Sequence, residues 1–139
     1  MAGGYTILEH PSDIGVEASA ESMEEAFALA AEGLMSVIVD PGTVAARESR
    51  VVALPAMDEE RLLVRWLGEV LYLYDGTGFV PSRFRVARAS AAGLSAEAFG
   101  EPADRDRHGM RLDVKAVTYH GVSVRRSPGV CEVRVFLDI

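Results

Sequence analysis

Two stretches of the chain carry apolar residues at helical spacing, and each of them begins with a helix-capping residue. In the first, Ser22 and Glu25 form a capping-box pattern, and apolar residues then recur every three or four positions up to about Val39. In the second, Asp58 precedes two glutamates and a broad apolar stripe that ends at residues 75–78, Asp-Gly-Thr-Gly. These patterns predict two helices, and the broad stripe predicts that the second helix is mostly buried.

The rest of the chain alternates apolar and polar residues over short runs that glycine and proline separate, as β-strands do. Strands are predicted at residues 5–9, 14–18, 49–56, 83–89, 94–100, 112–120, 122–126 and 130–137. Two helices and a series of hairpin-linked strands predict an α+β fold, a two-layer sandwich whose mostly antiparallel sheet carries both helices on one face. The order of the strands does not follow from the sequence. A length of 139 residues predicts a single domain over residues 1–139.

The composition argues against several classes of protein. The formal net charge is −7, whereas direct nucleic-acid binding usually needs a basic face that displaces counterions, so we expect no direct contact with nucleic acid. Cys131 is the only cysteine, which excludes an intrachain disulfide and a thiolate zinc cluster. No apolar run approaches the roughly 20 residues that span a bilayer, and the first residues do not form a signal peptide. A cytoplasmic protein without membrane association is expected.

The sequence contains none of the common local motifs of catalytic sites. There is no glycine-rich phosphate loop followed by Lys-Ser/Thr, no Gly-x-Ser-x-Gly and no His-Glu-x-x-His. The three histidines, His10, His108 and His120, are isolated from one another and lack metal-ligand spacing.

Carboxylates gather at the C-terminal end of the sequence. The last predicted strand stops at Asp138 and Ile139, so the Asp138 side chain lies one residue from the α-carboxylate. Two such anions repel each other by about 1 kcal/mol in water and about 4 kcal/mol at an intermediate dielectric, and a hard cation relieves that cost. The alternative is a solvated C-terminus with an incidental aspartate. Near the start of the chain, Asp13 shortly precedes Gly15, and its side chain suits an Asx turn equally well.

Four segments closely resemble the archease family, and the resemblance covers nearly the whole chain. They are residues 10–17 (HPSDIGVE), 22–27 (SMEEAF), 113–120 (DVKAVTYH) and 137–139 (LDI), which match the family in order and spacing. Two positions depart from the family pattern. Pro11 and Ser12 stand where the family has Thr-Ala, and Asp113 stands where the family usually has glutamate. Both departures keep the acidic oxygen chemistry.

This resemblance implies a protein cofactor rather than an enzyme. Archeases are small α+β proteins that assist an RtcB-type RNA ligase in tRNA splicing and RNA repair. They promote guanylylation of the ligase and let it turn over repeatedly. Carried over by position, the family's ligands of a divalent cation (Ca²⁺, or Mg²⁺/Mn²⁺) are Asp13 and Asp138, with the carboxylate of Ile139 as a further ligand. Asp40, after the first predicted helix, is an additional candidate.

The resemblance also indicates residues that contact the ligase or its phosphate-bearing substrate. These candidates are His10, His108, Lys115, Tyr119 and His120. A strand with a solvated lysine and a packed tyrosine is the alternative interpretation of the second motif. Two other classes of function stay open. One is a small metal-dependent phosphohydrolase with Lys115 as electrophile, and the other is a chaperone-like binding module with a structural cation. The oligomeric state does not follow from the sequence.

Overall fold

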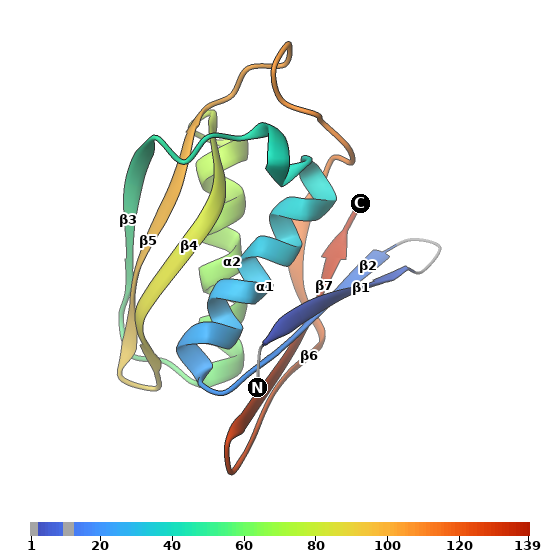
Figure 1. Cartoon of the computed structure of the whole chain (residues 1–139). Coiled ribbons are helices and arrows are strands. Elements are labelled where there is room, and N and C mark those ends of the chain that lie inside the picture. The colour runs from blue at the N-terminus through green and yellow to red at the C-terminus, as the bar shows by residue number, and fades with distance from the viewer. Residues whose placement is uncertain (1–2, 10–12) are drawn as a thin grey trace.

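The computed structural model describes residues 3–9 and 13–139, in which two antiparallel sheets and two α-helices are found (Figure 1). The four-stranded sheet has the order β1 (Gly4–Glu9), β2 (Asp13–Ala20), β7 (Val130–Asp138) and β6 (Ala116–Ser127). The three-stranded sheet has the order β3 (Glu48–Leu54), β5 (Gly93–Pro102) and β4 (Phe79–Ser90).

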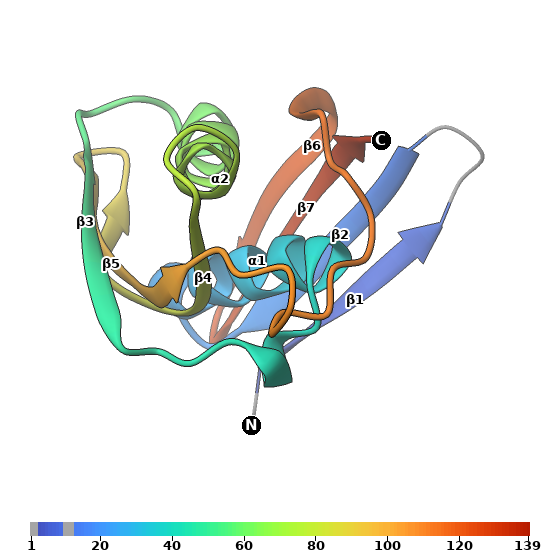
Figure 2. The same cartoon turned by 90° about the horizontal axis from the view of Figure 1, so that it is seen from above.

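The helices α1 (Met23–Ile38) and α2 (Glu59–Asp75) lie between the two sheets (Figure 2). Helix α1 packs against β2 of one sheet and β4 of the other, and α2 packs against β6 and β4. Buried side chains from both helices and both sheets therefore form one core. The predicted α+β sandwich of antiparallel strands is confirmed. The structure adds that the strands divide into two sheets, each covered by the helices on one face.

Both predicted helix starts are confirmed by their capping hydrogen bonds. The Ser22 hydroxyl accepts the N–H of Glu25 at 3.1 Å, and the Asp58 carboxylate accepts the N–H of Arg61 at 3.0 Å. Each cap satisfies an N–H group that has no partner within its own helix. Neither helix of the described chain is long and apolar enough to cross a membrane.

Two details of the strand prediction are wrong. Residues 112–115 are not a strand. The chain where they begin is hydrogen-bonded to the C-terminal end of α1 instead of to a neighbouring strand. There, the N–H groups of Arg111 and Leu112 donate to carbonyls of the last turn of α1 at 2.7 and 3.1 Å. Gly121 does not separate two strands either, since β6 runs through it and only its register against β7 shifts. The φ of +70° at Gly121 belongs to this irregularity, and glycine adopts it without steric cost.

Candidate functional site

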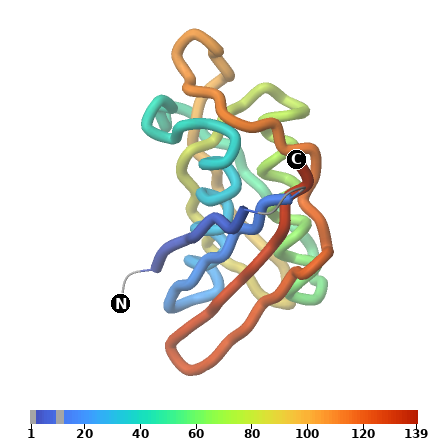
Figure 3. Tube along the Cα trace, turned by 90° about the vertical axis from the view of Figure 1, so that its right-hand side faces the viewer, coloured from blue at the N-terminus to red at the C-terminus, as the bar shows by residue number. Residues whose placement is uncertain are grey.

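The first residue of β2 and the last residue of β7 are both aspartates, and they face each other across the four-stranded sheet. These strands are antiparallel neighbours whose register pairs Asp13 with Asp138, and the C-terminal end of the chain accordingly lies beside the start of β2 (Figure 3). In the next pair, Ile14 and Leu137 are buried in the core. Alternation therefore turns both carboxylates to the outer face of the sheet, away from the helices.

This carboxylate pair suits a hard cation. Directly opposed residues have Cβ atoms about 4.5–5.5 Å apart, and like charges in that position destabilise the strand pair. A divalent cation held by both oxygen ligands would remove the repulsion. No group of three His, Cys, Asp or Glu side chains that could hold a metal ion occurs within the described part of the chain. Within the described residues, further ligands of a cation here would come from the Ile139 carboxylate, main-chain carbonyls or water.

The structure places the other metal candidate, Asp40, at the end of α1. Its carboxylate accepts the N–H of Gly42 at 3.0 Å and thereby caps the short 3-10 helix Pro41–Thr43. It also lies 3.9 Å from the Arg111 guanidinium. Asp40 thus has a local structural role. His10 and its neighbours Pro11 and Ser12 lie outside the described residues.

Part of the second motif lies next to the carboxylate pair. The N–H of Lys115 donates to the carbonyl of Asp138 at 2.8 Å, and Ala116 is the β6 partner of Asp138. The side chains of Lys115, Tyr119 and His120 are exposed. The His120 ring lies 6.5 Å from that of Phe136, centroid to centroid.

His108 has a different environment, because its ring is buried against Glu101. The two residues are only 3% and 1% exposed. Nδ1 of His108 accepts the N–H of Asp104 at 3.0 Å, so Nε2 carries the proton and donates it to the Glu101 carboxylate at 2.9 Å. The ring is therefore not presented at the surface as a partner contact would require.

Glu101 is the centre of a buried cluster that the sequence did not indicate. Its carboxylate also accepts the N–H of Ala45 at 2.8 Å, Nε of Arg47 at 3.1 Å and the guanidinium of Arg107. The Ala45 N–H, followed by the His108 ring and the Arg107 guanidinium, holds the pKa of the Glu101 carboxyl far below its usual range. Residues 101–108 (EPADRDRH) have the composition of a solvated loop, and no local pattern marks Glu101 as buried.

We expect Glu101 to make stability depend on acidity. Because its folded pKa is depressed, its contribution is complete above the unfolded pKa of about 4.3 and is lost as the pH falls through the folded value. Glu101→Gln should lower the urea midpoint at neutral pH and flatten its decline below about pH 4.3. Urea titrations from neutral to acidic pH measure both effects. Glu97→Gln is the control, since this carboxylate is ion-paired on the surface with Arg85 at 2.7 Å. Identical profiles for wild type and Glu101→Gln would contradict the expectation.

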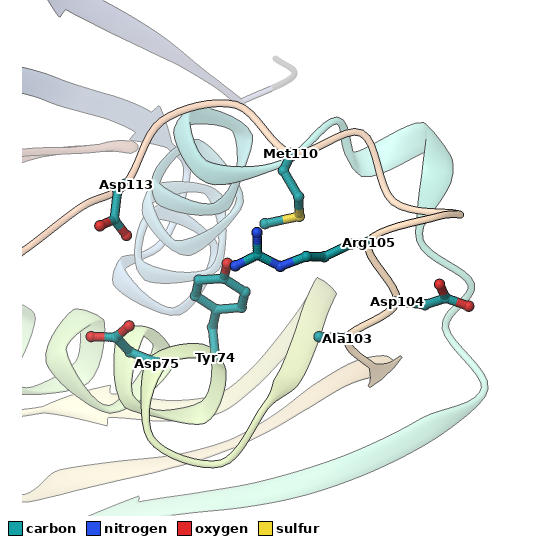
Figure 4. Close-up of a pocket in the computed structure, with 7 residues that line it drawn as sticks. All are labelled: Tyr74, Asp75, Ala103, Asp104, Arg105, Met110 and Asp113. Atoms are coloured by element: carbon teal, nitrogen blue, oxygen red, sulfur yellow. The ribbon is translucent and has the colours of Figure 1, made fainter.

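A cleft of about 410 Å³ lies between the end of α2 and the loop that follows β5 (Figure 4). Its lining residues are Tyr74, Asp75, Ala103, Asp104, Arg105, Met110 and Asp113. In Figure 4, the Arg105 side chain extends toward Tyr74, and Asp75 and Asp113 lie on the other side of the ring. Among the described residues, the lining combines three carboxylates with one guanidinium group and contains no Ser, Cys, His or Lys.

The fold and the carboxylate pair define a small α+β protein with an acidic site on an open sheet face, and comparisons with known proteins place it in a family. Residues 5–139 match the archease protein family. A protein archease from Thermococcus gammatolerans is 39% identical over 123 residues, which cover 86% of this chain and 87% of that protein. A protein archease from Aeropyrum pernix is 34% identical over 143 residues, which cover 100% and 99% of the two chains. The chain therefore belongs to the archease family, as its motifs predicted.

Two solved structures share the fold. Protein 1598 of Methanobacterium thermoautotrophicum superposes with a TM-score of 0.83 at 31% identity, covering 98% of this chain and 99% of that chain. A structure from Thermotoga maritima, described as an archease and possible chaperone, has a TM-score of 0.62 at 20% identity, covering 95% and 94%. The second similarity supports the fold alone.

Proposed function

We propose that this protein activates an RtcB-type RNA ligase, and that a divalent cation held by Asp13, Asp138 and the Ile139 carboxylate forms part of the activating surface. The observation that supports the proposal is the register of β2 and β7, which sets two aspartates from opposite ends of the sequence directly against each other. Family membership supports the ligase as partner. In this role the protein is a cofactor of the ligase and has no catalytic residue of its own.

The residues around the pair have distinct tasks in this proposal. Asp13 and Asp138 lie on paired strands rather than on a loop, so the sheet holds their spacing. The Lys115 N–H fixes the main chain of Asp138 from the β6 side, and the exposed Lys115 side chain is available to phosphate oxygens of the partner. When bound, the cation supplies a positive charge that attracts phosphate or carboxylate oxygens.

The test is single-turnover guanylylation of the matching ligase in the presence of wild type, Asp13→Asn or Asp138→Asn. We expect stimulation by wild type and a loss of at least about tenfold in each variant, because each removes one charged ligand. Glu132→Gln is the matched control. It removes an exposed carboxylate from the same strand and face, opposite Ser19 instead of another acid. No stimulation by wild type would refute the ligase assignment. Equal stimulation by wild type and Asp138→Asn would remove the cation from the mechanism.

The same variants give a second readout in the isolated protein. In the presence of a chelator, which keeps the protein metal-free, Asp13→Asn and Asp138→Asn should be more stable than wild type by up to about 1 kcal/mol. Each variant removes one of the two opposed like charges. In Ca²⁺, Mg²⁺ or Mn²⁺, wild type should gain about 2.7 kcal/mol at a hundredfold excess over the dissociation constant, and the variants should gain much less. Urea titrations measure both effects. Metal-dependent hydrolysis of phosphate esters by the isolated protein would instead favour the phosphohydrolase alternative.

A further inference from the structure

The three-stranded sheet has an outer face that is turned away from the helices (Figure 2). Positive charge gathers on this face, although the net charge of the chain is −7. Here the register of β4 against β5 sets three arginines opposite three outward residues. On the β3 side, Val51 is 76% exposed. We call this surface the basic face, and its residues are Arg83, Arg85 and Arg88 of β4, Ser95, Glu97 and Phe99 of β5, and Val51 of β3.

An irregularity in β4 keeps the third arginine on the basic face. Arg85 pairs with Glu97 before the irregularity. Ala87 then has no partner on β5, and Arg88 pairs with Ser95. Without this extra residue, strict alternation would turn position 88 toward the helices and the core. Bulges of this kind re-aim side chains. In β4, the bulge aligns three guanidinium groups along one strand.

A recess of about 340 Å³ lies on this face between the first two arginines and an aromatic ring. Its lining residues are Ala46, Arg83, Phe84, Arg85 and Phe99. Phe99 is half-buried and pairs across the strands with Arg83. The recess thus places an aromatic side chain next to two cationic groups, with room for a planar ring.

The positive charge of the basic face is only partly balanced. Glu97 forms an ion pair with Arg85 at 2.7 Å, but that arginine is still 73% exposed. Arg88 forms no salt bridge with any residue in the described ranges, and it is exposed. Burial raises the pKa of Glu32, which is half-buried on α1, and the charge of Arg83 acts on this carboxyl and opposes that rise. The exposed guanidinium groups therefore remain available to an anion in solution.

We propose that the basic face binds a single-stranded nucleic acid, with the three arginines on consecutive phosphates and Phe99 against a base. The three arginines lie opposite Phe99, Glu97 and Ser95, which are alternate residues of β5. Alternate residues of a strand lie about 6.7 Å apart, which is comparable to the distance between phosphates of an extended nucleotide chain. Guanidinium groups bind phosphate oxygens in pairs. Aromatic rings interleaved with cationic side chains hold single strands by stacking.

The net charge of −7, from which no nucleic-acid contact is expected, is a property of the whole chain. Charges act over only about 8 Å at physiological salt, so a bound strand would experience the local charge of the basic face. The proposal is independent of the cation and of the ligase. An acidic protein segment would also pair with the arginines, but its carboxylate side chains would not stack on Phe99 as a base would.

The experiment measures binding of a short fluorescent RNA to the full chain by anisotropy, between about 50 and 200 mM salt. Wild type is compared with the triple variant Arg83→Gln, Arg85→Gln and Arg88→Gln. We expect the variant to bind at least about tenfold more weakly at the lower salt concentration. The slope of log K against log salt should fall by about 2, because each phosphate contact on a single strand contributes about 0.7. Replacing the same three residues with lysine should retain most of the binding.

The control triple variant is Arg61→Gln, Arg65→Gln and Arg125→Gln. These arginines are exposed on α2 and β6, outside the basic face, and their replacement changes the net charge by the same amount as the first triple variant. It should bind like wild type, as should Asp138→Asn. Phe99→Leu should weaken binding about fivefold or more without changing the salt slope. Circular dichroism and thermal melting check that each variant is folded.

Three results would overturn the proposal. The first is no binding by folded wild type at about 50 mM salt. The second is an equal loss in the two triple variants, which would attribute binding to net charge alone. The third is a glutamate-rich peptide that binds as tightly as the RNA while Phe99→Leu has no effect. That outcome would assign the basic face to an acidic protein.

Discussion

Replacing Trp66 with alanine is expected to remove about 3–5 kcal/mol from the free energy of unfolding, a large part of the 5–15 kcal/mol typical of a domain. The side chain is fully buried in α2. Its Nε1–H donates to the carbonyl of Phe27 in α1 at 2.9 Å, and its ring meets Phe84 of β4 edge-on at 5.9 Å. One residue therefore joins both helices to the three-stranded sheet. Trp66→Phe, which keeps an aromatic ring but loses the hydrogen bond, should cost about 1–2 kcal/mol.

Urea denaturation followed by far-UV circular dichroism measures these losses, because both variants lack the only tryptophan and its fluorescence is not a common probe for all three proteins. Tyr72→Ala is the control on the same helix, because that ring is 58% exposed. Its effect should stay within about 0.5 kcal/mol. A loss below about 1.5 kcal/mol in Trp66→Ala would mean that the helices and the sheet are held together chiefly by other contacts.

The helices could be predicted because their signals are local. Ser22 and Asp58 are capping residues whose acceptors lie within three positions of the N–H groups that they bind. The division of the strands into two sheets could not be predicted, because it depends on pairs between distant parts of the chain. The pairing of β2 with β7 joins the two ends of the sequence.

The carboxylate pair shows how far sequence reasoning reaches. The charge at Asp138 and the candidate at Asp13 could both be recognised in the sequence, but their direct opposition required the register of β2 and β7. The Glu101 cluster had no such signal. Its partners come from two segments, residues 45–47 and 107–108, and no local pattern shows that these segments meet at Glu101. The basic face was hidden for a similar reason. The net charge says nothing about where charges lie, and alternation alone would have turned Arg88 inward.

The tight approach of β4 to β5 supports both the buried cluster and the basic face, and Gly100 is where it can be tested. A Cβ atom at this position would lie 1.9 Å from the carbonyl oxygen of Val80 and 2.7 Å from Cα of Pro81. Both are backbone atoms, so a strand rather than a side chain would have to move. Gly100→Ala is therefore expected to destabilise the protein by about 3 kcal/mol or more. Because Gly100 directly precedes Glu101, the displacement should also weaken the cluster.

Gly68→Ala is the matched control for this change. Gly68 lies within α2, and a Cβ atom there would meet nothing within 4 Å. Alanine should instead stabilise that helix by about 0.5–1 kcal/mol, because glycine loses more conformational freedom on folding. Urea titrations should thus show the same substitution acting in opposite directions at the two glycines. If Gly100→Ala were as stable as wild type, β4 and β5 would have to separate at little cost. The register that aligns the arginines would then not be fixed by this contact.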